Sequence, residues 1–320
     1  MKDTTPSNAM KSILKSLPAF VLILFVLSGC RPPAPTESSG RMSILVTVGM
    51  LTDIVRSVAG ETAEITGLIG EGVDPHLYAP SAADVRRIQA ADGILFVGHH
   101  LEGRLQSVFE RQAAQGKPVA AVAERIPVDT LLLDDEGNID PHLWMDVSLW
   151  ADVAREVHGV LLEWMPEARE ALDGNLTALL QDLEALDHEV MDILSTIPEE
   201  RRILITAHDA FGYLGRRYGL EVMGIQGMST DSEAGLRHIN ELVSMIVDRR
   251  IPAVFTESTI ADRNVRALIE GAASRGHTVR MGGELFSDAM GAPGTPEGTY
   301  AGMIRHNART LANALGTDGL

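Results

Sequence analysis

The stretch from residue 166 to 197, PEAREALDGNLTALLQDLEALDHEVMDILSTI, decides how the rest of the chain is arranged. Apolar side chains recur in it every three or four residues, which is the period of one helix face: Leu172, Leu176, Leu179, Leu183, Leu186, Val190, Ile193 and Ile197. Pro166 and Pro198 bracket the stretch as start and stop signals. Roughly 32 residues at about 1.5 Å each would reach about 48 Å. Such a helix can link two lobes rigidly, so we expect only small movements between them.

Short apolar runs alternate with amphipathic stretches on both sides of the predicted linking helix. Strands are expected at 44–48, 63–69, 94–97, 119–122, 202–207, 221–225, 253–256 and 278–281. Helices are expected at 53–59, 82–91, 101–114, 209–218, 233–249, 263–275 and 299–315. This alternation is typical of a parallel sheet covered by helices. The sequence therefore predicts an α/β fold of two Rossmann-like lobes with mainly parallel sheets, at 43–165 and 198–320, joined by one long rigid linking helix at 166–197.

The amino end predicts export and membrane attachment. Two lysines precede an apolar run at 17–27 that ends in small residues. This pattern indicates a secretory signal at 1–29, too short to span a bilayer. It ends at Cys30, and the Leu-Ser-Gly-Cys sequence there resembles the bacterial lipobox, in which the cysteine is acylated. Residues 30–42 then form a Pro- and Ser-rich flexible tether. The alternative is that Cys30 is a free thiol.

Charge and cysteine content limit the partners of the chain. The net charge is −17, and residues 1–29 hold three lysines against one aspartate, so the remainder carries −19. This charge disfavours nucleic acid as a partner and favours either cation attraction or simple solubility. A single cysteine excludes an internal disulfide, so the core alone must stabilise the exported protein. We expect a monomer.

Two nearly identical pentapeptides, DPHLY at 74–78 and DPHLW at 140–144, each place a histidine in a loop. Proline stiffens the turn before each histidine. Because open α/β sheets bind ligands at the carboxyl ends of their strands, we asked which polar side chains follow predicted strands. They are His76, His142, His208 and Asp288, two in each lobe. Three imidazoles and one carboxylate suit a transition metal, whereas calcium and magnesium prefer mostly oxygen ligands.

Further side chains are candidates for supporting roles. Asp74 and Asp140 could accept a hydrogen bond from the imidazole nitrogen that faces away from the metal, or cap the following helix, and capping is favoured. Glu257 follows a predicted strand and is a candidate for the same supporting position. His99 and His100 also follow a strand and could replace one ligand. Because imidazoles must be neutral to bind metal, we expect affinity to fall below about pH 6.

Catalytic interpretations find less support. The sequence has no Gly-x-Ser-x-Gly elbow, no phosphate-binding Gly-rich loop followed by Lys-Ser or Lys-Thr, and no His-Glu-x-x-His. Four ligands can fill a tetrahedral site, which suits carrying a metal better than reacting with it, so we do not expect an enzyme. Two alternatives remain: a metal-independent surface adhesin and a zinc-dependent hydrolase. A receptor for organic solutes is disfavoured, because aromatic residues make up only 4% of the chain.

Five segments resemble those of one protein family and occur in the same order: EGVDPHLY at 71–78, DPHLWMD at 140–146, TAHDAF at 206–211, FTES at 255–258 and LFSD at 285–288. They are similar to the zinc- and manganese-binding solute receptors of ABC transporters, the cluster A-I lipoproteins, some of which are called adhesins. The likeness extends from about residue 43 to 315.

The resemblance implies a two-lobed receptor with a rigid linking helix and a zinc or manganese ion in the cleft. The family's ligand positions correspond to His76, His142, His208 and Asp288. The resemblance also implies delivery of the ion to a membrane permease driven by an ATPase. Many zinc receptors of the family carry a long His-rich loop before the second ligand. In this chain the corresponding loop, at 131–139, is short and acidic. Both metals therefore stay open.

Overall fold

The computed structural model describes residues 1–2, 40–134 and 136–316. The predicted lipidation site Cys30 lies outside these ranges, as do nearly all of the predicted signal at 1–29 and the predicted tether at 30–42. All helices and strands described below fall within one compact unit, Arg41–Leu320. Among the described helices, none combines the length and the apolar character that a membrane span requires.

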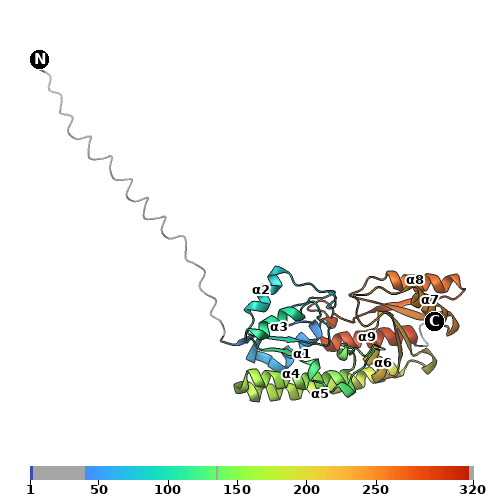
Figure 1. Cartoon of the computed structure of the whole chain (residues 1–320), viewed down its shortest axis with the longest axis horizontal. Coiled ribbons are helices and arrows are strands. Elements are labelled where there is room, and N and C mark those ends of the chain that lie inside the picture. The colour runs from blue at the N-terminus through green and yellow to red at the C-terminus, as the bar shows by residue number, and fades with distance from the viewer. Residues whose placement is uncertain (3–39, 135, 317–320) are drawn as a thin grey trace. The chain divides into compact units, whose positions relative to one another are not determined.

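The predicted linking helix is present. A 3₁₀ turn, η5 (Pro166–Ala168), leads into α5 (Arg169–Ser195), a helix of 27 residues. At about 1.5 Å per residue this helix is about 40 Å long. It contacts two helices from each half of the chain, as Figure 1 shows: α1 (Gly49–Ala59), α4 (Val147–Trp164), α6 (Gly212–Tyr218) and α9 (Tyr300–Leu315). The predicted apolar face faces these helices, because all of its members are buried or pack against the core.

The N-terminal half forms a four-stranded parallel sheet in the order β2-β1-β3-β4. Its strands are β1 (Met42–Val46), β2 (Ala63–Gly67), β3 (Gly93–Phe96) and β4 (Val119–Ala121). Successive strands are connected by α1, α2 (Ala82–Ala90) and α3 (Gln106–Ala114). Ser81 and Asp84 form a capping box that fixes the start of α2. This half is therefore a βαβ arrangement, as the sequence predicts.

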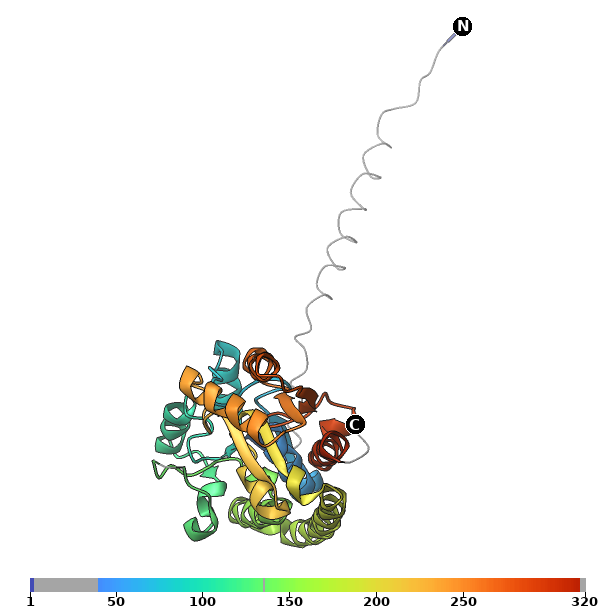
Figure 2. The same ribbon diagram turned by 90° about the vertical axis from the view of Figure 1, so that its right-hand side faces the viewer.

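The C-terminal half repeats the plan with two parallel strand pairs, β5-β6 and β7-β8. The strands are β5 (Ile203–His208), β6 (Glu221–Gln226), β7 (Ala253–Glu257) and β8 (Arg280–Leu285), and β5 also contacts β7. The accompanying helices are α6, α7 (Leu236–Asp248), α8 (Arg263–Ser274) and α9. Figure 2 shows helices on both sides of the strands. The predicted α/β class with mainly parallel sheets is confirmed.

Two apolar clusters form the core. The larger one joins the first sheet to α4, α5 and α9, and the smaller one lies between the strands β5, β6 and β7 and the helices α7 and α8. Within the larger cluster, the rings of Trp144, Trp150 and Tyr300 are fully or almost fully buried. The ring centroids of Trp144 and Trp150 are 6.1 Å apart, and those of Trp150 and Tyr300 are 6.0 Å apart. Because Trp144 follows His142 by two residues, this packing holds the loop that carries His142 in place.

The structure differs from the expected elements in several places. Helix α4 lies outside the expected elements, although Trp150, Val153, Ala154, Val157, Val160 and Leu161 recur in it every three or four residues. Asp146 caps this helix by accepting hydrogen bonds from the N–H groups of Ser148 and Leu149. The helices expected from 101 and 209 begin only at Gln106 and Gly212, after turns. Short 3₁₀ turns occupy Gly60–Thr62, Ala123–Arg125, Val128–Thr130, Leu143–Met145, Glu199–Arg201 and Pro296–Gly298. The division at 43–165, 166–197 and 198–320 stays a prediction.

Candidate metal centre

Four side chains from distant parts of the chain meet in one buried group: His76, His142, His208 and Asp288. Their exposed fractions are 4%, 0%, 0% and 1%. His208 is the last residue of β5, and Asp288 lies three residues beyond the end of β8, so both occupy the carboxyl ends of strands as expected. His76 and His142 instead come from longer loops: β2 ends at Gly67, and the last strand before His142 ends at Ala121. The sequence places His76 beyond a Gly-rich turn at 70–73 and His142 beyond an acidic loop at 134–140, and the structure has both histidines in loops.

The spacing of the four side chains fits one metal ion. One ligand atom from each lies within 4.8 Å of all the others. The Asp288 carboxylate oxygens stand 3.7, 3.3 and 3.2 Å from Nε2 of His76, His142 and His208, and the first two Nε2 atoms are 3.4 Å apart. Ligands at about 2.1 Å from a tetrahedral ion would stand about 3.4 Å from one another. These four separations are close to that value, and the set of four ligand atoms stays within 4.8 Å, so the group is compact enough to surround one ion.

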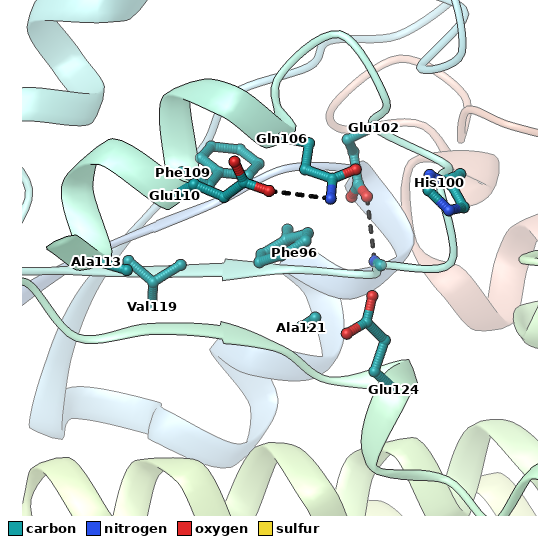
Figure 3. A pocket seen from close by; sticks show the side chains of 11 residues that line it. Phe96, His100, Glu102, Gln106, Phe109, Glu110, Ala113, Val119, Ala121 and Glu124 are labelled. Atoms are coloured by element: carbon teal, nitrogen blue, oxygen red, sulfur yellow. Dashed lines mark hydrogen bonds between the residues drawn. The ribbon is translucent and has the colours of Figure 1, made fainter.

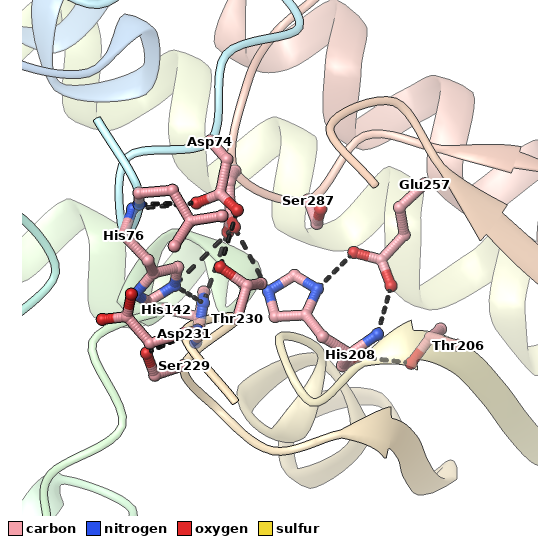
Figure 4. Close-up of polar contacts among 12 residues, drawn as sticks. Asp74, His76, His142, Thr206, His208, Ser229, Thr230, Asp231, Glu257 and Ser287 are labelled. Carbon is pink, nitrogen blue, oxygen red and sulfur yellow. Dashed lines mark hydrogen bonds and ion pairs between the residues drawn. The ribbon is translucent and has the colours of Figure 1, made fainter. Parts of the chain in front are cut away.

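Carboxylates bond two of the imidazoles on the side away from the group of four and fix their orientation, as Figure 4 shows for Glu257 and His208. Asp140 Oδ1 accepts hydrogen bonds from His142 Nδ1 at 2.7 Å and from the His142 backbone N–H at 2.9 Å. Glu257 accepts from His208 Nδ1 at 2.5 Å and from the His208 backbone N–H at 2.8 Å. A hydrogen on each Nδ1 leaves the Nε2 lone pair facing the group of four. Glu257 thus lies where the sequence places it, whereas Asp140 bonds the imidazole of His142 and does not take the capping role that the sequence favours.

Asp74 behaves differently from Asp140. Its Oδ1 accepts the backbone N–H of His76 at 2.8 Å, but its Oδ2 accepts the hydroxyl of Thr230 at 2.6 Å. In the described part of the chain, Asp74 makes no hydrogen bond with an imidazole. Asp74 therefore fixes the loop backbone of His76 and ties it to a residue 156 positions later.

Three atoms of the group are buried without a hydrogen-bond partner among the described residues: His208 Nε2 and both carboxylate oxygens of Asp288. Buried polar atoms usually have partners, so a cluster of three exceptions needs a cause. A bound cation would satisfy all of them at once. The donor set, three imidazoles and a carboxylate, is one that borderline transition metals favour.

The charges of the group are arranged so that a divalent ion can replace protons. Burial lowers the pKa of His76 to about 4, despite the nearby Asp288 carboxylate. Burial acts in the same direction on His142, but Asp140 and Asp288 outweigh it and raise the pKa of His142 to about 9. Glu257 and Asp288 likewise outweigh burial and raise the pKa of His208 well above its ordinary value. The surrounding carboxylates thus favour protons on His142 and His208 in the metal-free site, and a divalent ion can replace these protons when it binds.

Comparison with known proteins places the chain in a family. Residues 44–314 match the family described as ZnuA, zinc-uptake complex component A, periplasmic. The chain belongs to the ZnuA family.

Similar members are known by sequence and structure. The zinc-binding protein TroA of Treponema pallidum is 43% identical over 300 residues, covering 93% of this chain and 97% of TroA. The manganese-binding lipoprotein MntA of Bacillus subtilis is 41% identical over 299 residues, with the same shares of the two chains covered, 93% and 97%. The solved structure of the periplasmic zinc-binding protein TroA has a TM-score of 0.84 at 44% identity and covers 87% of this chain and 100% of that one. The similarity thus spans the whole body that contains the buried group.

The remaining histidines of this ZnuA-family chain lie outside the group of four. His99 and His100, the predicted replacements, line a neighbouring cavity of about 410 Å³ together with His76. His158 pairs with Asp173, and His188 is exposed on α5. His238, His277 and His306 bond backbone carbonyls at 2.9, 2.8 and 3.0 Å. Neither His99 nor His100 replaces one of the four.

Two residues that support the site were not predicted. The indole N–H of Trp144 donates to the carbonyl of Ser287 at 2.8 Å, which fixes the backbone next to Asp288. The Trp144 ring also stands edge-on to His142, with 5.2 Å between centroids. The position of this tryptophan at the end of DPHLW, two residues after His142, could have indicated its role. Thr230 is the second residue, because it donates to Asp74, but nothing in the sequence around Thr230 indicates that contact.

Proposed function

We propose that this chain is an extracytoplasmic solute-binding receptor that captures one divalent transition metal ion through His76, His142, His208 and Asp288 and delivers it to an ABC-type permease. The observation that carries the proposal is the buried group of four, in which one ligand atom from each side chain lies within 4.8 Å of all the others. Membership of the ZnuA family supports it, as do relatives named for zinc binding and manganese binding.

The ion we propose is zinc or manganese. Relatives of nearly equal identity, 43% and 41%, are named for the two metals respectively. Three imidazoles with one carboxylate bind zinc more tightly than manganese on the general order of affinities. Manganese would therefore be carried where it is more available than zinc. Both oxygens of Asp288 lack hydrogen-bond partners, so the carboxylate can bind through one or two atoms and serve either geometry.

The site favours transport over catalysis. The group is almost fully buried, and its four side chains complete a tetrahedral shell, which leaves no position for a reacting water. Asp140 and Glu257, the nearby carboxylates, are both engaged by imidazoles. We therefore propose a receptor without enzymatic activity.

The proposed partners are a permease and its ATPase, with the receptor acting as a monomer held at the membrane through a lipid on Cys30. The relative MntA is named a lipoprotein, which supports the anchor. Mass spectrometry of the protein from membranes checks this step, since acylation adds lipid mass to the peptide that begins at Cys30. An unmodified cysteine would contradict the anchor but not the metal site.

The function is tested by stripping the purified protein of metal with a chelator, offering equimolar zinc and manganese, and measuring retained metal by elemental analysis. We expect one ion per chain, with zinc in excess. The His142→Ala variant should retain none after the same washing. Less than a tenth of an ion per chain in the unaltered protein would reject the proposal.

A further inference from the structure

The two histidines that the group of four leaves out lie in an unusual turn. Gly98, His99 and His100 have φ angles of +95°, +49° and +63°, and Leu101 N–H donates to the Gly98 carbonyl at 3.1 Å. Residues other than glycine rarely occupy this left-handed region; asparagine, aspartate and histidine do so more often than the rest, but two such residues in succession are unusual. Strained residues of this kind concentrate at functional sites.

Several contacts hold this turn in place. The buried carboxylate of Glu102 accepts the N–H groups of Val97 at 2.9 Å and Gly98 at 3.2 Å, and it also accepts the hydroxyl of Thr47 at 2.6 Å. Figure 3 shows Glu102 beside the turn that carries His100. On the other side, the His99 ring bonds the Ala123 carbonyl through Nε2 at 3.0 Å. The turn is fixed at both ends, while His100 itself is exposed.

His100 shares a cavity with one of the four side chains of the metal site. This cavity of about 410 Å³ is lined by His76, His99 and His100, and on other sides by Glu136, Met228 and Ser229. Its lining among the described residues includes two carboxylates and no lysine or arginine. His76 is the most exposed of the four proposed ligands, at 4% against 1% or less. The cavity is therefore an imidazole-rich space, suited to cations, that borders the buried site.

We propose that His100 is a transient ligand that receives the divalent metal ion in this cavity before the ion reaches His76 and the buried group. The inference rests on the proposed function. A hydrated ion must exchange its water molecules for imidazoles in steps. The exposed imidazole of His100, which lines the cavity next to His76, replaces the first water molecule. His99, whose Nε2–H is engaged by a carbonyl, fixes the position of the turn.

A ligand used only on the way in has a distinctive kinetic signature. It stabilises the intermediate through which the ion both enters and leaves. Removing it slows association and dissociation by the same factor, because the dissociation constant depends only on the free and fully bound states. A ligand of the final site behaves differently, since its removal speeds dissociation and weakens binding.

The test measures Co²⁺ binding to the full chain by stopped-flow quenching of tryptophan fluorescence, with dissociation measured by chelator chase. We expect His100→Gln to lower both rate constants by about fivefold, with an unchanged dissociation constant. His100→Asn should do the same, although asparagine tolerates the left-handed conformation and keeps the turn. His188→Gln, which removes an exposed histidine from α5, is the matched control and should change neither rate.

Each outcome is decisive. Unchanged rates in both His100 variants overturn the inference, as does weaker binding with faster dissociation, which would place His100 in the final site. Slow binding in His100→Gln but not in His100→Asn would assign the effect to the backbone and also overturn it. Failure of the unaltered protein to bind Co²⁺, Zn²⁺ or Mn²⁺ would instead reject the proposed function.

Discussion

The loops at 74–78 and 140–144 begin with the same four residues, Asp-Pro-His-Leu, and the structure shows which properties those residues share. In both loops the aspartate Oδ1 accepts the backbone N–H of the histidine two residues later, at 2.8 Å for His76 and 2.9 Å for His142. This local turn, stiffened by the proline between them, points both imidazoles into one buried group. The shared residues thus determine the shared backbone geometry.

The surroundings make the two loops differ in everything else. Leu77 is 39% exposed, whereas Leu143 and Trp144 are fully buried. Asp140 also bonds the imidazole of His142, whereas the second oxygen of Asp74 bonds Thr230 in the other half of the chain. As a result the pKa of His76 is lowered by burial to about 4, while carboxylates outweigh burial and raise that of His142 to about 9. The comparison teaches that a repeated motif fixes local geometry but not electrostatic role.

The largest expected effect comes from removing either imidazole. His76→Ala and His142→Ala should each weaken zinc binding by about a thousandfold, because each removes one of four proposed ligands from a site worth roughly 10 to 16 kcal/mol. Affinity is measured by competition with a chelator, and circular dichroism checks the fold.

His277→Ala is the control, since the His277 ring bonds the backbone carbonyl of Ile251 at 2.8 Å and lies outside the group of four. It should leave the affinity unchanged. A loss in this variant as large as in the other two would mean that the assay reports folding rather than ligation. A strong loss from only one loop would show that the two histidines are not equivalent ligands.

Much of the fold was predictable because its signals are local. The apolar period at 166–197 defined α5, and alternating short apolar runs defined the strands. Helix α4 carries the same signal, because its buried residues Trp150, Val153, Ala154, Val157, Val160 and Leu161 recur every three or four positions on one face. The expected starts of α3 and α6 are too early because turns precede both helices. Periodicity thus identifies an element but does not fix the residue at which it begins.

The members of the site were also predictable, but their relationships were not. Placing polar residues after strands selected all four converging side chains, although His76 and His142 come from longer loops. The sequence left two roles open for Asp140, and the structure shows that one oxygen bonds both the backbone and the imidazole. The partnership of Asp74 with Thr230 depends on tertiary packing between residues 156 positions apart. No local pattern encodes such a contact.

The second largest expected effect is the dependence of zinc affinity on pH, which tests the different pKa values of His76 and His142. Affinity was expected to fall below about pH 6, near the ordinary histidine value. Because the pKa of His142 is raised to about 9 and that of His208 well above its ordinary value, we expect the metal-free protein to bind protons at both imidazoles near neutral pH. Free protein then binds more protons than loaded protein, so zinc affinity should rise with pH, by up to about a hundredfold per unit, until the pH passes about 9.

Calorimetry in buffers of different ionisation enthalpy counts the released protons. We expect nearly two per zinc ion at pH 7, from His142 and His208, and none from His76, whose lowered pKa keeps it neutral. No proton release at pH 7 would contradict the charge arrangement, although it would leave the ligand set intact.

The smallest effect distinguishes the two aspartates directly. In Asp140→Asn the amide oxygen can still accept both hydrogen bonds, but the negative charge behind His142 is lost, so zinc affinity at high pH should fall by about 10- to 100-fold. The pKa of His142 should also fall, and fewer protons should be released at pH 7. Asp74→Asn also keeps its backbone hydrogen bond and can donate to the Thr230 hydroxyl, so affinity should change by less than about threefold and proton release should not change. Equal losses of zinc affinity from the two substitutions would show that Asp74 acts on the metal site without a hydrogen bond to the His76 imidazole. The two loops would then differ in packing alone.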